Sequence, residues 1–122
     1  GLAVCYPGLE SHPDHALFNE LRSAEYGYGG VFTLDVGDAD TANELMSHLQ
    51  NEQRFGYLAV SLGYFDTLMS CSASSTSSEL TDEDQAAAGI SPGLVRFSIG
   101  YTGTLEQRWA QLRAALKETG IG

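Results

Sequence analysis

Segments typical of β-strands and of helices alternate along this 122-residue chain, and the alternation limits the folds that are open to it. The strand-like segments are rich in apolar residues and end at turn residues such as glycine. They lie at 2–6, 31–36, 57–61 and 94–99. The helix-like segments lie near 13–21, 38–49, 81–89 and 104–120. The pattern predicts an α/β sandwich of the α+β type, in which helices cover one face of a small, mostly antiparallel sheet.

Local signals mark where three of these helices begin. Asp38 is a typical N-cap, and the residues after it repeat at the spacing of one helix face. Thr81 is followed by three acidic residues, which suit the first turn of a helix. Thr104 and Gln107 have the form of a capping box. The predicted apolar faces of the second and fourth helices are Ala42, Leu45, Met46 and Leu49, and Leu105, Trp109, Leu112 and Leu116.

The length of the chain fits a single domain over residues 1–122. The chain starts at Gly1 without a methionine and enters a strand-like segment at once. We therefore expect it to be a piece of a longer protein. Seven of the nine residues at 70–78 are Ser or Thr, and such a stretch is expected to form a loop because it cannot nucleate a core.

An excess of acidic residues limits the partners of the chain. Sixteen Asp and Glu face six Lys and Arg, for a formal net charge of -10, so nucleic acid and anionic membrane surfaces are disfavoured as partners. No apolar run approaches the ~20 residues of a membrane span. Cys5 and Cys71 lie far apart without a CxxC spacing, which excludes a disulfide-dense scaffold and a cysteine zinc site and favours a cytoplasmic setting.

Most chemically active residue types occur here in patterns that favour no site. His12 and His15 lie three residues apart, but nothing in the sequence offers the third ligand that a metal needs. The glycines at 27–30 precede a strand, whereas phosphate-binding loops follow a strand and open a helix. We therefore predict no metal site and no phosphate loop.

Unlike these histidines and glycines, Arg96 lies in a pattern that suits a binding site, because it is inside the most strand-like segment of the chain. Alternation places Val95 and Phe97 on one face and Arg96 and Ser98 on the other. A planar guanidinium whose direction is fixed by a strand suits a carboxylate ligand. A solvated face or an internal ion pair is the alternative. Ser61, before a glycine, is predicted either to contact a ligand or merely to end its strand.

Several ordered strings give the chain a recognisable pattern. They are YPGL at 6–9, EYGYGG at 25–30, VSLG at 60–63, LMSCS at 68–72, SSTSSEL at 74–80, GISPGLVR at 89–96 and GYTGTLEQ at 100–107. Together they resemble the C-terminal domain of the Cys/Met-metabolism family of pyridoxal-phosphate (PLP) enzymes, which includes methionine gamma-lyases and the cystathionine synthases and lyases. The plant-type methionine gamma-lyases are the most similar, and the likeness covers nearly the whole chain.

The resemblance implies a C-terminal domain that closes one side of an active site, beside a large fold-type-I domain that binds PLP and is absent here. It implies that Arg96 binds the α-carboxylate of a sulfur amino-acid substrate, that Ser61 adds a contact to this carboxylate and that Thr76 lies near it. The chemistry of the family needs a lysine that forms a Schiff base. Lys117 is the only lysine and has no pattern for that role, so we expect PLP in the parent enzyme and neither cofactor nor activity in this chain alone.

The function that the resemblance implies is a PLP-dependent carbon–sulfur lyase. The parent would eliminate methanethiol from L-methionine, leaving 2-oxobutanoate and ammonia, and would assemble as a homotetramer. The alternatives are a cystathionine gamma-synthase or lyase relative, in transsulfuration, and a non-catalytic interaction module. Cys71-Ser72 replaces the His-Pro of many bacterial members, and the substrate preference stays open.

Overall fold

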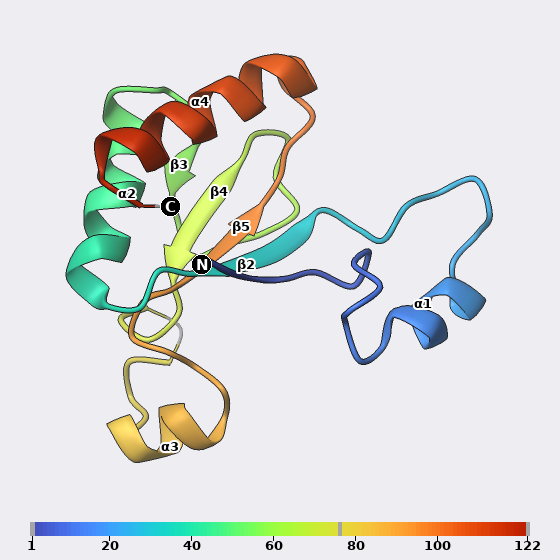
Figure 1. Ribbon diagram of the computed structural model, residues 1–122, viewed down its shortest axis with the longest axis horizontal. Helices are drawn as coiled ribbons and strands as arrows, with labels where there is room; N and C mark the ends of the chain where they lie inside the picture. The colour runs from blue at the N-terminus through green and yellow to red at the C-terminus, as the bar shows by residue number, and fades with distance from the viewer. Residues whose placement is uncertain (1, 76, 122) are drawn as a thin grey trace.

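The computed structural model describes residues 2–75 and 77–121. Over these residues the strands form a single sheet, with some helices beside it and others that extend away from it (Figure 1). The strands are β1 (Ala3–Cys5), β2 (Val31–Asp35), β3 (Tyr57–Leu58), β4 (Leu68–Cys71) and β5 (Leu94–Ser98). The helices are α1 (His15–Leu21), α2 (Ala39–Asn51), α3 (Asp82–Ala87) and α4 (Leu105–Glu118).

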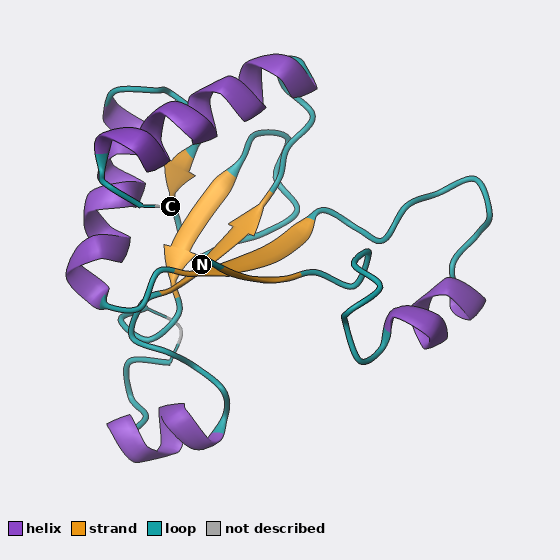
Figure 2. Ribbon diagram, viewed as in Figure 1, coloured by secondary structure: helices purple, strands orange, loops and turns teal. Residues whose placement is uncertain are grey.

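The sheet has the order β1-β2-β5-β4-β3, so the last strand of the chain lies at its centre. Its pairs are antiparallel except for β3 and β4, which run parallel. Helix α2 packs against β3, β4 and β5, and α4 packs against α2 on the same side of the sheet (Figure 2). The prediction of a small, mostly antiparallel sheet is therefore confirmed, and α2 and α4 lie on one face of it as predicted. Within the described residues, α1 and α3 do not pack on the sheet.

The core lies between the sheet and α2. Ala42, Leu45, Met46 and Leu49 of α2 are all buried, as their spacing predicted. They pack on Leu34, Phe55, Met69, Cys71, Val95, Phe97 and Ala115. The cap prediction is also confirmed, because the Asp38 side chain accepts a hydrogen bond from the Thr41 amide.

One strand lies where the sequence predicted a loop. Ser70 and Cys71 form the end of β4, so the expected loop at 70–78 is wrong at its first two residues. All four residues of β4 are buried. A strand that is covered on both faces shows no alternation of polar and apolar residues, and its small Ser and Cys side chains look like those of a loop. Thr76, proposed for the site, lies outside the described residues.

Helix α4 forms as predicted, with its capping box of Thr104 and Gln107, but its apolar stripe is only partly covered. Leu105 is 81% exposed and Trp109 is 55% exposed. An open groove runs between α4 and the edge of the sheet at β1 and β2, and it is lined by Leu2, Val4, Phe32, Leu34, Phe55, Ile99, Leu105, Arg108, Trp109, Leu112 and Leu116. Within the described residues, no helix has both the length and the apolar character that crossing a membrane requires.

Candidate functional site

The candidate site is built on the face of the sheet that points away from α2. Val95 and Phe97 of β5 lie in the core, so Arg96 between them projects from the opposite face. The strand register places Thr33 of β2 and Ser70 of β4 directly opposite Arg96. Residues directly opposite in a sheet share a face. Thr33, Arg96 and Ser70 therefore form a polar row across the three central strands.

The structure brings Ser61 and Arg96 together, through the main chain of Ser61. The Nη2 atom of Arg96 donates a hydrogen bond of 2.6 Å to the carbonyl oxygen of Ser61. The Ser61 residue itself is exposed, and Arg96 is half-buried. The guanidinium is thus aimed at the turn that carries Ser61, on the solvent side of the sheet.

Arg96 has no acidic partner in the part of the chain that the structure describes. Among the residues that the structure describes, the ion pair that is present joins Arg108 to Asp66, and no carboxylate lies within ion-pair distance of Arg96. The internal ion pair that the sequence left open for Arg96 is therefore not formed within residues 2–75 and 77–121. Arg96 is half-buried, and its guanidinium is therefore available to an anionic ligand.

The loop over Arg96 follows from the parallel pairing of β3 and β4. Parallel neighbours cannot be joined by a tight turn, so residues 59–67 have to cross from one end of the strands to the other. On the way, the amide of Gly63 donates to the hydroxyl of Ser98 at 3.0 Å. Two hydrogen bonds, one to Ser98 and one from Arg96, thus hold the turn at 61–63 against β5.

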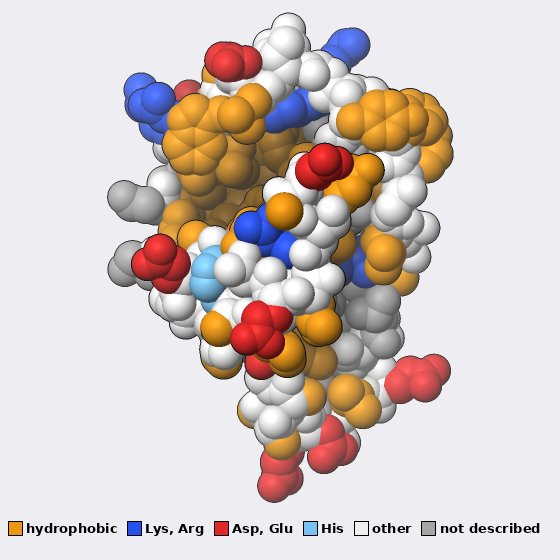
Figure 3. Space-filling model, turned by 90° about the vertical axis from the view of Figure 1, so that its right-hand side faces the viewer, with side chains coloured by type: hydrophobic (Ala, Val, Ile, Leu, Met, Phe, Trp, Pro, Cys, Tyr) orange, Lys and Arg blue, Asp and Glu red, His pale blue; other side chains and the backbone are white. Residues whose placement is uncertain are grey.

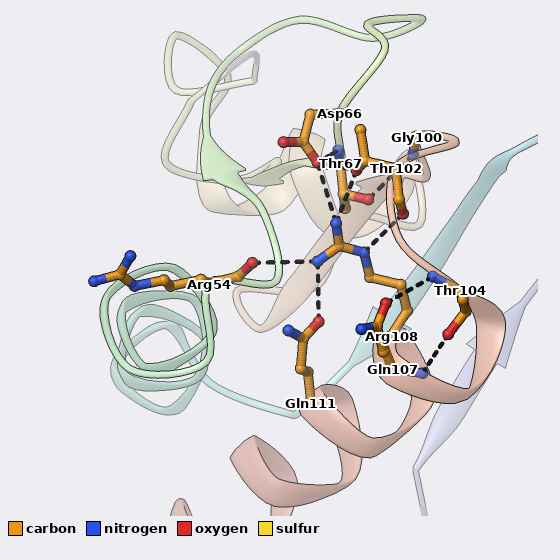
Figure 4. A network of polar contacts seen from close by, with 9 residues as sticks. All are labelled: Arg54, Asp66, Thr67, Gly100, Thr102, Thr104, Gln107, Arg108 and Gln111. Atoms are coloured by element: carbon orange, nitrogen blue, oxygen red, sulfur yellow. Dashed lines mark hydrogen bonds and ion pairs between the residues drawn. The ribbon is translucent and has the colours of Figure 1, made fainter.

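The far end of this loop is fixed by a polar network around Arg108 of α4 (Figure 4). Its guanidinium donates to the carbonyl and the hydroxyl oxygens of Thr102 at 3.1 and 2.8 Å. Its Nη1 donates to the Arg54 carbonyl and to Gln111. Asp66 lies 3.8 Å from Nη2 and accepts from the Thr102 hydroxyl at 2.7 Å. Arg108 therefore joins α4, the end of the loop at Asp66 and the segment after β5.

Sequence reasoning missed Ser70 and Arg108. The sequence predicts a loop at Ser70, and the position of Ser70 opposite Arg96 depends on the register of two strands, which no local pattern reveals. Arg108 follows directly after the capping box of α4, and the sequence gives no sign of the loops that its guanidinium reaches. The described residues contain no group of three or more His, Cys, Asp or Glu that could hold a metal ion.

The comparisons with known proteins agree on one family. A family of Cys/Met metabolism PLP-dependent enzymes matches residues 2–117. The chain is 58% identical over 115 residues to a methionine gamma-lyase of Arabidopsis thaliana, a match that covers 94% of this chain and 26% of that protein. It is 30% identical to a cystathionine beta-lyase of Lactococcus lactis subsp. cremoris, over 94% of this chain and 28% of the relative.

Solved structures give the same result. A cystathionine gamma synthase from Xanthomonas oryzae pv. oryzae, in complex with aminoacrylate and cysteine, superposes with a TM-score of 0.81 at 34% identity. That match covers 97% of this chain and 29% of the synthase chain. The chain thus spans about a quarter of the length of the curated relatives that it matches.

Proposed function

The chain belongs to the Cys/Met-metabolism family of PLP-dependent enzymes, and we propose that within such an enzyme it binds the α-carboxylate of a sulfur amino-acid substrate. Arg96 carries this proposal, because its guanidinium projects from a central strand and has no carboxylate partner among the described residues. A guanidinium forms two parallel charge-assisted hydrogen bonds with a carboxylate. Arg96 therefore both holds the substrate and orients it.

Ser61 and Thr76 are proposed as further contacts of the carboxylate. Ser61 lies beside the Arg96 guanidinium, and the turn that carries it is exposed, so a ligand that reaches Arg96 meets this turn. The proposed role of Thr76 is based on the family resemblance alone. When the carboxylate arrives, it replaces the neutral Ser61 carbonyl as the acceptor of Arg96 with a charged and therefore stronger one.

The residues of this chain do not fit PLP by themselves. The carbonyl carbon of the cofactor forms a Schiff base with a lysine. Lys117 is the only lysine of the chain. It lies on α4, whereas Arg96 projects from the opposite side of the sheet. The proposal is that the rest of a longer protein binds PLP, and that this chain contributes the carboxylate site.

The apolar groove beside α4 supports a longer protein. Its volume is about 430 Å³, and Figure 3 shows hydrophobic side chains gathered around a hollow on this side of the molecule. Soluble domains seldom leave such a continuous apolar surface open to water. We propose that the large PLP-binding domain of the same polypeptide covers it.

The reaction that we propose for the whole protein is the elimination of methanethiol from L-methionine, with 2-oxobutanoate and ammonia as the other products. The identity of 58% to a methionine gamma-lyase supports this choice. A cystathionine lyase or synthase activity is the second candidate, because relatives with those names match over most of this chain. Both substrates carry the same α-carboxylate, so Arg96 serves either.

The setting of the enzyme is also a proposal. Cys5 and Cys71 are both free cysteines, which supports a reducing, cytoplasmic compartment. We also propose that the enzyme is a homotetramer and that it acts in transsulfuration. Both proposals are based on the family resemblance.

The test is steady-state kinetics of the full-length protein with L-methionine and with L-cystathionine. Arg96→Ala is expected to lower kcat/KM about 10- to 150-fold, the loss of a hydrogen-bonded charge pair worth about 1.5–3 kcal/mol. Arg96→Lys restores little, because an ammonium lacks the planar fork. Arg113→Ala is the control, since it removes an exposed arginine from α4. Unchanged kcat/KM and unchanged melting of Arg96→Ala would remove Arg96 from the site.

A further inference from the structure

Two residues of the proposed site that are directly opposite each other in the sheet each carry a buried polar atom without a hydrogen-bond partner among the described residues. Among the described residues, the buried side-chain nitrogen and oxygen atoms that lack a hydrogen bond are Nδ1 of His48, Oγ of Ser70 and Nε of Arg96. Ser70 and Arg96 are directly opposite each other in β4 and β5. A buried polar atom that gives up water without a new partner is costly, and such atoms are rare in folded proteins. Their pairing therefore points to a shared ligand.

The geometry of the sheet allows one ligand atom to reach both groups. Directly opposite residues of antiparallel strands have Cβ atoms about 4.5–5.5 Å apart. The Ser70 hydroxyl is attached to its Cβ, and the Arg96 Nε lies further along its side chain on the same face. Ser70 is only 5% exposed, so solvent contributes little to the surroundings of its hydroxyl.

We propose that Ser70 is a substrate-binding residue, whose hydroxyl donates to the same carboxylate oxygen that accepts from Nε–H of Arg96. The proposal rests on the carboxylate site described above. An ionised carboxylate offers about four acceptor positions, so one oxygen serves Ser70 and Nε while the second serves an Nη atom of Arg96. Both orphaned atoms then gain a partner in a single binding event.

Binding requires the turn at 61–63 to give way. This turn is exposed, and it is held to β5 by the bonds from Arg96 to Ser61 and from Gly63 to Ser98. The incoming carboxylate replaces the first of these bonds. Ser70 and Arg96 stay where the strands hold them, so the two donors are oriented before the ligand arrives.

The test compares Ser70→Ala with Ser75→Ala in the full-length enzyme loaded with its cofactor. Ser70→Ala is expected to raise KM for L-methionine about tenfold, the loss of one hydrogen bond to a charged group, with kcat little changed. Its melting temperature stays the same or rises, because an unpartnered buried hydroxyl is removed. Ser75 donates instead to the Cys71 carbonyl at 2.6 Å, so Ser75→Ala lowers the melting temperature and leaves KM unchanged.

Two inhibitors show whether the carboxylate is the group that Ser70 contacts. Competitive inhibition by L-norleucine should weaken in Ser70→Ala by the same factor as KM rises, and inhibition by L-norleucinamide, which has no carboxylate, should not change. Ser70→Cys keeps the shape of the side chain with a weak donor, and an intermediate effect is expected of it. It also provides the same comparison where Ser70→Ala fails to fold.

Other outcomes overturn the inference. Unchanged KM in both Ser70 variants, with unchanged melting, shows that the hydroxyl contacts nothing. Unchanged KM with a lowered melting temperature shows that Ser70 has a structural partner such as a bridging water. An equal loss with the amide inhibitor shows a general distortion of the site. If Arg96→Ala lowers kcat/KM while Ser70→Ala has no effect, only this inference fails. If Arg96→Ala also has no effect, the proposed function fails with it.

Discussion

Replacing Arg108 with alanine tests how the loop beside the site is fixed. The substitution removes hydrogen bonds to Thr102, Arg54 and Gln111 and the ion pair with Asp66. The side chains of Arg108 and Asp66 are 20% and 18% exposed, so water replaces part of what is lost. Asp66 also keeps its bonds from the Thr67 amide and the Thr102 hydroxyl.

The expected loss follows from these contacts. Each hydrogen bond from a charged donor contributes about 1.5–3 kcal/mol when buried, whereas an ion pair near the surface contributes about 0–1 kcal/mol. The Arg108 side chain is partly exposed and the ion pair is long at 3.8 Å, so water replaces much of each contact and the total loss falls well below the sum of these values. We therefore expect Arg108→Ala to lower the free energy of unfolding by about 2–4 kcal/mol. For a chain of this length that is about 8–15 °C in Tm.

Urea and thermal unfolding of the chain measure this loss. Arg108→Lys is expected to recover less than half of it, because one ammonium cannot reach both the Thr102 and the Arg54 carbonyls. Arg113→Ala, on the exposed side of the same helix, should change the stability by less than about 0.5 kcal/mol. A Tm of Arg108→Ala within about 2 °C of the unmodified chain, where about 8–15 °C is expected, would refute the role given to this network.

Two further substitutions test features outside the network. The Thr41 amide and hydroxyl donate to Asp38 and hold the pKa of its carboxyl below the ordinary 3.8. Since the folded pKa is the lower one, the stabilising effect of Asp38 is complete above the unfolded pKa and is lost as the pH falls through the folded value. The urea midpoint of Asp38→Asn should therefore fall less between pH 6 and pH 3 than that of the unmodified chain, and equal falls would contradict this. Trp109 lines the apolar groove, and Trp109→Lys should reduce concentration-dependent self-association of the chain in sedimentation. If the unmodified chain stays monomeric at every concentration, the exposed apolar stripe does not cause self-association.

The parts of the fold that sequence predicts are those with local causes. Helix α2 has an N-cap and four apolar residues on one face, and all four are buried. The start of α4 follows in the same way from its capping box. The helical periodicity of apolar residues does not show what packs against the apolar face. It therefore predicted the apolar stripe of α4 but not the exposure of Leu105 and Trp109 to solvent. Strand β4 had no local signal because both of its faces are covered.

In the candidate site, too, the sequence predicts only what has a local cause. Arg96 could be found from the alternation of its own strand, because the two neighbours of an outward-facing residue in a strand point inward. The meeting of Ser61 with Arg96 needs a crossover loop, and the position of Ser70 needs a register between strands. Both are properties of the assembled sheet. They therefore became visible only in the structure.

The central position of β5 sets the order in which this chain can fold. The strand order places β1 and β2 on one side of β5 and β4 and β3 on the other, and two-stranded ribbons are at best marginally stable in water. On the ribosome, the edges of β2 and β4 that pair with β5 therefore stay without a partner strand until residues 94–98 have been synthesised. Open edges are where nascent chains associate wrongly. Because the strand that completes the sheet also carries Arg96, a chain interrupted before residue 94 lacks the cooperative fold and the site together.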